Sequence, residues 1–303
     1  MYERLLVPLD GSKLAEAALP YAEELAGMFD SELLLLEVCE PDQMEFSHMC
    51  QLYIEQMGKL AKQHIEEYYK KEGAKVGTTV TSGEPAEEIV AYSKKNDISL
   101  VVATTHARSG ITSWAMGTVA NRLLREIRAP IVLIRPTIPQ VEAGMRRLLG
   151  KILVPLDGSD AGAASLPHVE GLAVRLKADI ILLQVIELGR HVHTVGGLDY
   201  VPYPEPVVES LKGKARDYLE KIGTTLRGRG CVVRSEVRVG ESAQQIIRVA
   251  DEIGAHLVVM STHGRSGIKK WAFGSVTDKV LQAGHTPIML VRTSYSPSTT
   301  PQS

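Results

Sequence analysis

One stretch of the chain combines glycines, a hydroxyl side chain and positive charges as phosphate sites do. Within residues 260–276, MSTHGRSGIKKWAFGSV, nine residues separate Gly264 from Gly274, and Ser275 follows. Glycines let backbone amides approach a phosphate, and a helix N-terminus supplies amide donors. The pattern predicts an anion site at the start of a helix. The alternative is structural: the glycines form turns, and Ser275 with Asp278 begins the helix as a capping box.

A carboxylate follows a predicted strand earlier in the chain. VPLDGS places Asp157 directly after the strand, with Ser159 two residues later. Such a carboxylate can accept hydrogen bonds from ribose hydroxyls or an adenine amino group, or one of the two residues can simply cap the next helix. In open parallel sheets ligands bind beyond the carboxyl ends of the strands, where the strand order reverses. We therefore expect Asp157 and the glycine-rich loop at the same edge.

The chain repeats itself once over nearly its full length. RLLVPLDGS at 4–12 returns as KILVPLDGS at 151–159, and the loop THARSGITSWAMGTV returns as THGRSGIKKWAFGSV. Each copy alternates branched-aliphatic runs with helical patterns, which indicates an α/β fold with a parallel sheet. In the first copy the pattern predicts one helix over 12–28 and strands at 4–9, 32–38, 75–81, 99–104 and 130–135.

Composition excludes several classes of protein. The chain has 303 residues, 44% of them hydrophobic and 23% charged, and a formal charge of −2. Two domains are expected at this length, and no apolar run is long enough to span a membrane. The balanced charge argues against a nucleic-acid partner. Cys39, Cys50 and Cys231 form no CxxC pair, so neither a disulfide framework nor a cysteine zinc site is expected. With no secretory signal in the sequence, we expect a cytoplasmic protein.

The strand end VPLDGS, the glycine loop and the last strand PIMLVR resemble the universal stress protein family, here as a tandem of two domains. The family signature is Gly, two residues, Gly, nine residues, Gly, then Ser or Thr; the second copy keeps all but the first glycine, where Ser261 stands. The resemblance implies two repeated open five-stranded parallel-sheet domains with helices on both faces. That fold is Rossmann-like, related to the adenine nucleotide alpha hydrolases, with strand order 3-2-1-4-5. We expect domains at 1–136 and 148–293, a linker at 137–147 and a disordered tail at 294–303.

The resemblance also implies ATP as the ligand. Its adenine and ribose would contact Pro155, Asp157 and Val185, with Met260 and Ser261 on the ribose side, and its phosphates would contact Gly264, Arg265, Gly274, Ser275 and the amide of Val276. Magnesium would be held by the phosphates more than by protein ligands. His191 and His193 stand two apart in the insertion at about 189–206, but no third ligand has a matching spacing, so no protein metal site is expected.

The first copy departs further from the signature. Thr104 stands at the first glycine and Ala107 at the second. If Gly264 has a positive φ, Ala107 would meet a penalty of roughly 1 to 2 kcal/mol, and its methyl would crowd the phosphate path. We expect this copy to bind ATP weakly or not at all. Its corresponding residues are Pro8, Asp10, Val38, Arg108, Gly117 and Thr118.

The leading interpretation is a nucleotide-binding regulatory protein of the stress-response type, with an unidentified protein partner. The alternatives are a slow ATP-hydrolysing enzyme and an interaction module that binds no nucleotide. The sequence has no Walker-type GxxxxGK[ST] and no paired carboxylate placed to activate water, which argues against an enzyme. The resemblance further implies pairing through the last strands, PIVLIR and PIMLVR, within one chain as a pseudo-dimer or between two chains as a homodimer.

Overall fold

The computed structural model describes residues 1–39, 47–105, 116–135, 147–188, 192–194, 198–200, 203–262 and 274–292. The expected linker, except for Arg147, and the expected tail lie outside these ranges. The first repeat contains β1 (Arg4–Leu9), α1 (Lys13–Glu16), α2 (Leu19–Phe29), β2 (Glu32–Cys39), α3 (Ser47–Tyr68), β3 (Val76–Ser82), α4 (Pro85–Lys95), β4 (Leu100–Thr104), α5 (Thr118–Glu126) and β5 (Ile131–Ile134). The second contains β6 (Lys151–Pro155), α6 (Asp160–Ala163), α7 (Leu166–Leu176), β7 (Asp179–Ile186), β8 (Val192–Thr194), β9 (Leu198–Tyr200), α8 (Glu205–Gly228), β10 (Val232–Val239), α9 (Ser242–Ile253), β11 (Leu257–Ser261), α10 (Ser275–Ala283) and β12 (Ile288–Val291).

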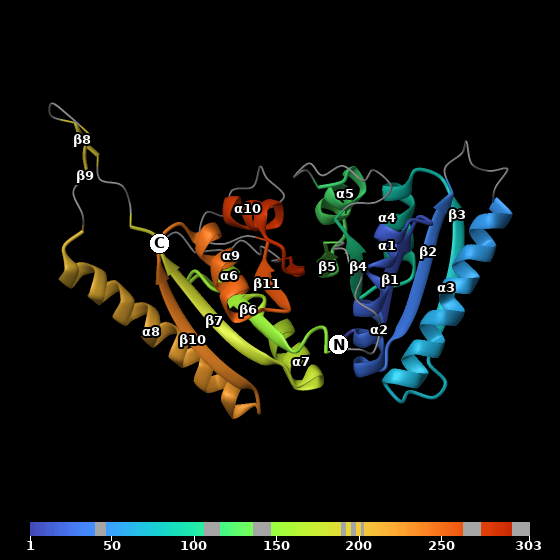
Figure 1. Cartoon of the computed structure of the whole chain (residues 1–303), viewed down its shortest axis with the longest axis horizontal. Helices are drawn as coiled ribbons and strands as arrows, with labels where there is room; N and C mark the ends of the chain where they lie inside the picture. The colour runs from blue at the N-terminus through green and yellow to red at the C-terminus, as the bar shows by residue number, and fades with distance from the viewer. Residues whose placement is uncertain are drawn as a thin grey trace, which may run out of the picture.

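The two repeats share one ten-stranded sheet, in the order β10-β7-β6-β11-β12-β5-β4-β1-β2-β3 (Figure 1). Within each repeat the strands of this sheet are parallel, and each half has the predicted order 3-2-1-4-5. The strands β8 and β9 form a separate antiparallel pair. β5 and β12 pair antiparallel, with Val132 opposite Met289. The expected pairing of the last strands is therefore present within the chain. It covers two edges that would otherwise be exposed.

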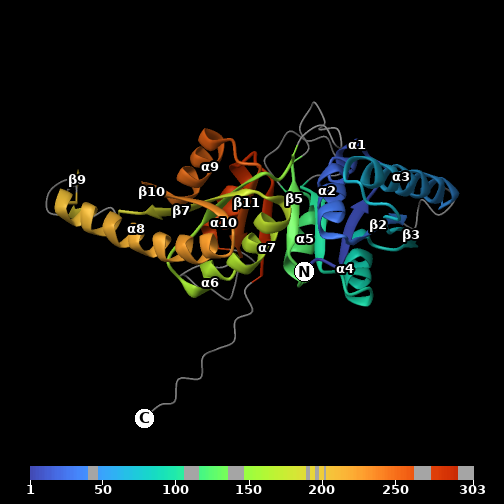
Figure 2. The same ribbon diagram turned by 90° about the horizontal axis from the view of Figure 1, so that it is seen from below.

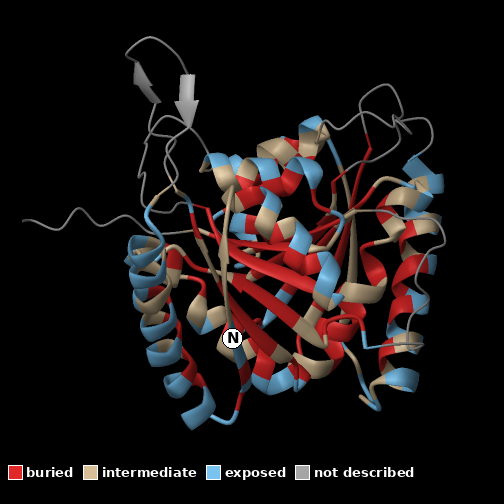
Figure 3. Cartoon of the chain, turned by 60° about the vertical axis from the view of Figure 1, so that its left-hand side comes forward, coloured by how far each residue is buried: buried red, intermediate tan, exposed pale blue. Residues whose placement is uncertain are grey.

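Helices cover both faces of the sheet, and the core lies in two layers. Side chains of α2, α3, α7 and α8 pack on one face, and those of α4, α5, α9 and α10 pack on the other. The inner strands between them are largely buried, while the outer helix surfaces are exposed (Figure 3). This explains why the inner strands are continuous apolar runs. The edge strands β3 and β10 are mostly half-buried or exposed, and their sequences are more polar. No helix in the described ranges is long and apolar enough to cross a membrane.

The predicted helix over 12–28 is wrong in one respect, because the structure breaks it into α1 and α2. Ser12 caps α1 by accepting a hydrogen bond from the Ala15 amide at 3.1 Å. Pro20 then lies in the first turn of α2. Proline is tolerated in a first turn, where its missing N–H is not needed, but it disrupts a helix interior. Pro167 occupies the same position in α7 of the second repeat.

Two arginines join the repeats beyond the strand pairing. Arg135, after β5, donates to two carbonyls near the C-terminal end of α10. One is that of Leu281, and the other is that of Gln282, at 2.6 Å. Arg292, after β12, donates in the same way to Leu124 at 2.9 Å and to Arg125, near the end of α5. A cation at a helix C-terminus satisfies carbonyls without helical partners and opposes the negative end of the dipole. We call these two contacts the arginine clamps.

The junction also includes α2 and α7, which are in contact (Figure 2). The Tyr2 hydroxyl lies 2.8 Å from Nδ1 of His168, and the Glu24 carboxylate accepts the Leu148 amide at 2.8 Å. Burial of Tyr2 raises its pKa well above the ordinary range, so it stays a neutral phenol. These contacts help fix the position of the second repeat against the first, and one of them involves Tyr2 near the N-terminus.

Candidate functional site

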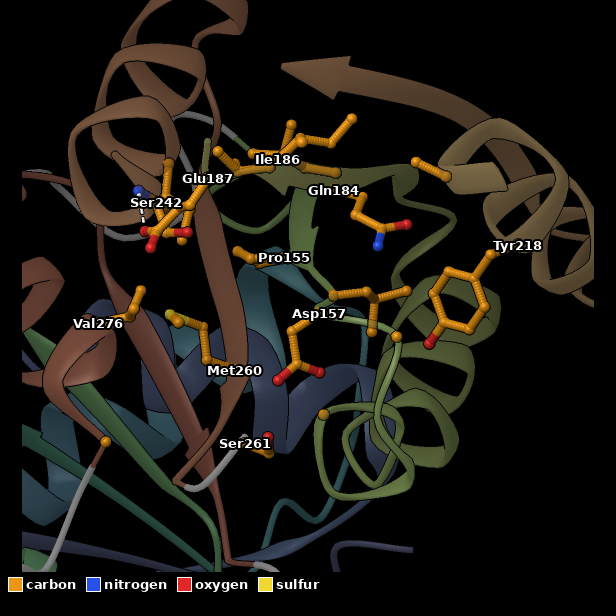
Figure 4. A pocket seen from close by; sticks show the side chains of 18 of the residues that line it. Pro155, Asp157, Gln184, Ile186, Glu187, Tyr218, Ser242, Met260, Ser261 and Val276 are labelled. Atoms are coloured by element: carbon orange, nitrogen blue, oxygen red, sulfur yellow. Dashed lines mark hydrogen bonds between the residues drawn. The ribbon is translucent and has the colours of Figure 1, made fainter. Parts of the chain in front are cut away.

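A cavity of about 700 Å³ lies where the carboxyl ends of β6, β7 and β11 meet α8 and α10 (Figure 4). β6 is the strand at which the order of the second repeat reverses, because the chain places β7 on one side of it and β11 on the other. Eight predicted residues line this cavity: Pro155, Asp157, Val185, Met260, Ser261, Gly274, Ser275 and Val276. Gly264 and Arg265 lie outside the described residues.

Asp157 points into the cavity, and its backbone turn holds it there (Figure 4). Its Oδ1 accepts hydrogen bonds from the amide of Ser159 at 3.0 Å and from the hydroxyl at 2.6 Å. Ser159 Oγ in turn accepts the Gly162 amide at 3.0 Å and so caps α6. The capping alternative is therefore right for Ser159, whereas Asp157 orients the cap and presents a carboxylate to the cavity.

The start of α10 has the form of an anion-binding end. Gly274 is the N-cap and no side chain caps the helix, so the capping-box alternative for Ser275 and Asp278 is wrong. The Gly274 amide donates to the Thr262 carbonyl at 2.9 Å, and the first intrahelical bond runs from the Asp278 amide to Gly274. The amides of 275–277 have no acceptor within the helix. They lie beside the cavity at the positive end of the helix dipole.

The main chain of Val185 faces the cavity because β7 is longer than β6. The Leu156 amide donates to the Leu183 carbonyl at 2.8 Å, so Leu183 faces β6. The Ile186 carbonyl accepts the Gly240 amide at 3.0 Å, so Ile186 faces the other neighbour, β10. Because backbone groups alternate along a strand, Val185 faces the β6 side again, beyond the point where β6 ends. Its N–H and C=O thus form a donor and acceptor pair at the cavity wall.

Other lining residues were missed by the sequence reasoning. Gln184 projects from β7, and Lys214 and Tyr218 project from α8. Gln184 Oε1 is fully buried and has no hydrogen-bond partner among the described residues. A signal for Gln184 existed, since it is the one amide in the apolar run DIILLQVI. Nothing in the sequence pointed to the α8 residues, because their place depends on how that helix packs.

Glu187 is the other carboxylate of the described lining. Its Oε1 accepts the amide of Ser242, in the first turn of α9, at 2.7 Å. Glu187 thereby satisfies one of the free amides at the N-terminus of α9, at the β7 side of the cavity. Among the described residues no cluster of His, Cys, Asp and Glu could hold a metal ion. His191 lies outside the described residues, and the side chain of His193 is not described.

The first repeat reproduces the backbone of the site. Asp10 accepts from the Ser12 amide at 3.0 Å and its hydroxyl at 2.6 Å, as Asp157 does from Ser159. Gly117 is the N-cap residue of α5, which begins at Thr118, and no side chain caps this helix. The Gly117 amide donates to the Thr105 carbonyl at 2.9 Å. Pro8 and Val38 lie in β1 and β2, at the strand positions of Pro155 and Val185. Arg108 and Ala107 lie outside the described residues.

The side chains around Asp10 differ in charge from those around Asp157. Glu37 stands where the second repeat has Gln184, and Glu16 where it has Ala163. The Tyr53 hydroxyl donates to Glu16 at 3.3 Å. Burial raises the pKa of Tyr53 well above its usual range, and the charges of Glu16, Glu37 and Asp10 raise it further. Three carboxylates thus act on one phenol, whereas the matching positions of the second repeat hold one carboxylate.

Sulfur also lies at this end of the first repeat. Burial raises the pKa of the Cys50 thiol to about 12, with further contributions from Cys39 and Glu37. A thiol with such a pKa is almost entirely protonated at neutral pH and is a poor nucleophile. Cys50 therefore adds bulk to this region rather than reactivity.

Comparison with known proteins places the chain in one family. The universal stress protein family matches residues 1–135 and again residues 149–292. A universal stress protein of Mycolicibacterium smegmatis is 25% identical over 302 residues, covering 95% of this chain and 96% of the relative. One of Bacillus subtilis is 30% identical over 151 residues, covering 48% of this chain and all of the relative.

A solved structure has the same tandem architecture. The crystal structure of a universal stress protein from Archaeoglobus fulgidus superposes with a TM-score of 0.65 at 17% identity, covering 95% of this chain and 96% of that one. At this identity the likeness concerns the fold. The two family matches show that the chain belongs to the universal stress protein family, as a tandem of two family units.

Proposed function

We propose that the second domain, 148–293, binds ATP as a regulatory ligand. The observation that carries the proposal is the cavity itself, which brings a carboxylate, a backbone donor and acceptor pair, and an uncapped helix N-terminus to one place. The base would lie along the main chain of Val185, the ribose beside Asp157 and Ser261, and the phosphates at 274–276. Gly264 and Arg265 are proposed to complete the phosphate site.

Each part of this cavity fits a different part of the nucleotide. The first-turn amides of α10 and the helix dipole favour phosphate oxygens. A carboxylate such as Asp157 accepts hydrogen bonds from ribose hydroxyls, which neutral acceptors bind less strongly. The Val185 N–H and C=O match the acceptor and the amino group on one edge of adenine. Magnesium would be carried by the phosphates, because the described residues supply no protein cage for it.

The proposal assigns weaker binding to the first domain. Glu16 and Glu37 add two carboxylates beside Asp10, and all three act on Tyr53. Additional negative charge opposes the approach of a nucleoside triphosphate. Thr104, the last residue of β4, and Ala107 stand at the positions of the first two signature glycines. The helix N-terminus at Gly117, although it repeats that at Gly274, is therefore not sufficient for tight nucleotide binding.

A regulatory role is favoured by how α10 is held. Its N-terminus borders the cavity, and carbonyls near its C-terminus accept hydrogen bonds from Arg135 of the first repeat. A ligand shifts an equilibrium only through different affinities for its two states, and α10 connects the ligand end to the junction. The described lining from β11 and α10 contains neither carboxylate nor histidine to activate water. We therefore propose occupancy, rather than turnover, as the signal to a protein partner.

Calorimetric titration tests the proposal. ATP with magnesium is titrated into nucleotide-free protein, and into Asp157→Ala and Asp10→Ala. The two substitutions break equivalent turns, so they have matched structural costs. We expect about one site in the unmodified chain and in Asp10→Ala, and none in Asp157→Ala. Loss of binding only in Asp10→Ala, or no binding by the unmodified chain, would contradict the proposal.

A further inference from the structure

We infer that Gln184 selects the base, with its Oε1 accepting a hydrogen bond from the 6-amino group of adenine. This inference rests on the proposed function and names the side chain that sets its specificity. Gln184 is adjacent to Val185, whose main chain faces the cavity. The amide therefore lies next to the groups proposed to hold the edge of the base.

The position of Gln184 separates it from the phosphate end. Its amide projects between Asp157 and Tyr218, whereas Val276 of α10 lies across the cavity (Figure 4). The α8 part of the wall consists of Leu211, Ala215 and the ring of Tyr218, which are mainly apolar, together with the cation of Lys214. A planar base fits a slot of this kind better than a charged phosphate does. An amide within such a wall gives the slot its polar specificity.

The energetic reason is the buried oxygen. Oε1 of Gln184 is inaccessible to solvent and accepts no hydrogen bond from any described residue. A buried acceptor without a partner costs free energy, and a rotation of the Gln184 side chain that turns Oε1 into the cavity lets a ligand donor recover that cost. Adenine offers an amino group at C6, whereas guanine and hypoxanthine carry an oxygen there. To meet that oxygen the Gln184 amide has to turn over and present its Nε2 hydrogens, which leaves Oε1 without a donor, so the slot favours the amino base.

The first repeat provides a natural contrast at the same position. Glu37 replaces Gln184 in otherwise similar strands, ELLLLEVC and DIILLQVI. A glutamate keeps acceptor oxygens but adds a negative charge and can donate nothing when ionised. Substituting Gln184 by glutamate therefore keeps the acceptor and changes only the charge, so the two effects can be measured separately.

The test compares ATP with purine riboside triphosphate, which lacks only the 6-amino group. Dissociation constants for both are measured by calorimetry on the unmodified chain, Gln184→Leu, Gln184→Glu and, as a matched control, Glu37→Gln. We expect the unmodified chain and the control to prefer ATP about tenfold, which corresponds to about 1.4 kcal/mol. The preference should fall in Gln184→Leu to the smaller part that the Val185 carbonyl provides. It should persist in Gln184→Glu, while both nucleotides bind more weakly.

Four results would overturn the inference. A preference unchanged in Gln184→Leu would place the recognition of the amino group on the main chain instead, and leave the proposed function standing. Equal affinity of the unmodified chain for the two nucleotides would show that no group of the site recognises the 6-amino group, and would leave ATP binding itself standing. Binding of neither nucleotide by the unmodified chain would reject the proposed function and this inference with it. If Gln184→Leu fails to fold, loss of the preference in Gln184→Glu rejects the inference.

Discussion

The buried carboxyl of Glu23 makes the stability of the first repeat depend on pH. Glu23 lies in α2 and is 2% exposed. Burial raises its pKa to about 7, although His64 of α3, with Nδ1 3.2 Å from Oε2, acts in the opposite direction. Tyr69 also faces this carboxyl, and burial together with the charges of Glu24 and Glu23 raises the pKa of its phenol well above the usual range. The native state therefore binds this proton more tightly than the unfolded chain does.

The size of the effect follows from the pKa. A pKa of about 7 against an ordinary 4.5, at about 1.4 kcal/mol per pKa unit, corresponds to about 3 kcal/mol. Because the pKa is raised, this contribution is complete below about pH 4.5 and is lost as the pH rises through about 7. In Glu23→Gln the group no longer titrates, while the amide can still bond His64.

Thermal unfolding between pH 5 and pH 8 measures this contribution. The unfolding midpoint of Glu23→Gln, relative to that of the unmodified chain, should rise by about 5 °C from pH 5 to pH 8. Glu67→Gln, an exposed change on α3, is the control and should show no such rise. A constant difference between Glu23→Gln and the unmodified chain across the pH range would refute the reasoning about desolvation.

Two further predictions concern the junction between the repeats and the packing of glycines in helices. Arg135→Ala and Arg292→Ala each remove one arginine clamp and should cost about 1 to 2 kcal/mol, seen as lower unfolding midpoints and faster proteolysis; unchanged midpoints in both would show that strand pairing alone holds the junction. Gly58→Ala would place a Cβ 2.5 Å from Cγ2 of Thr78 on the neighbouring β3, and should destabilise by about 2 kcal/mol in denaturant unfolding. Gly213→Ala, in α8 with nothing within 4 Å, should instead stabilise by up to about 1 kcal/mol; equal effects of the two glycine changes would contradict the packing argument.

The architecture could be predicted because its signals are local and duplicated. Buried parallel strands are uninterrupted apolar runs, and the two copies of VPLDGS mark the same strand end twice. The break between α1 and α2 was missed because the spacing of apolar residues continues across it, and the effect of Pro20 outweighs that spacing. The arginine clamps have a duplicated signal, the last residue of PIVLIR and PIMLVR. Their role depends on the antiparallel pairing of β5 with β12, which brings each arginine to the opposite repeat.

The candidate site was only partly predictable, because some of its residues belong to local motifs and others are brought there by packing. Asp157 and Gly274 belong to motifs that a short stretch of sequence defines. Lys214 and Tyr218 reach the cavity only through the packing of α8, which follows the insertion and has no register fixed by the repeat. The contrast of Gln184 with Glu37 is visible in the sequence, but its meaning depends on the buried oxygen that the structure shows.

The central claim is that one nucleotide site operates in the second domain. The most direct measurement is to purify the chain without added nucleotide, denature it, and identify and count the released nucleotide by chromatography and mass spectrometry. Our account predicts about one ATP per chain, retained in Asp10→Ala and lost in Asp157→Ala. An absence of nucleotide, together with no binding when ATP is added back, would contradict it, as would two nucleotides per chain of which each substitution removes one.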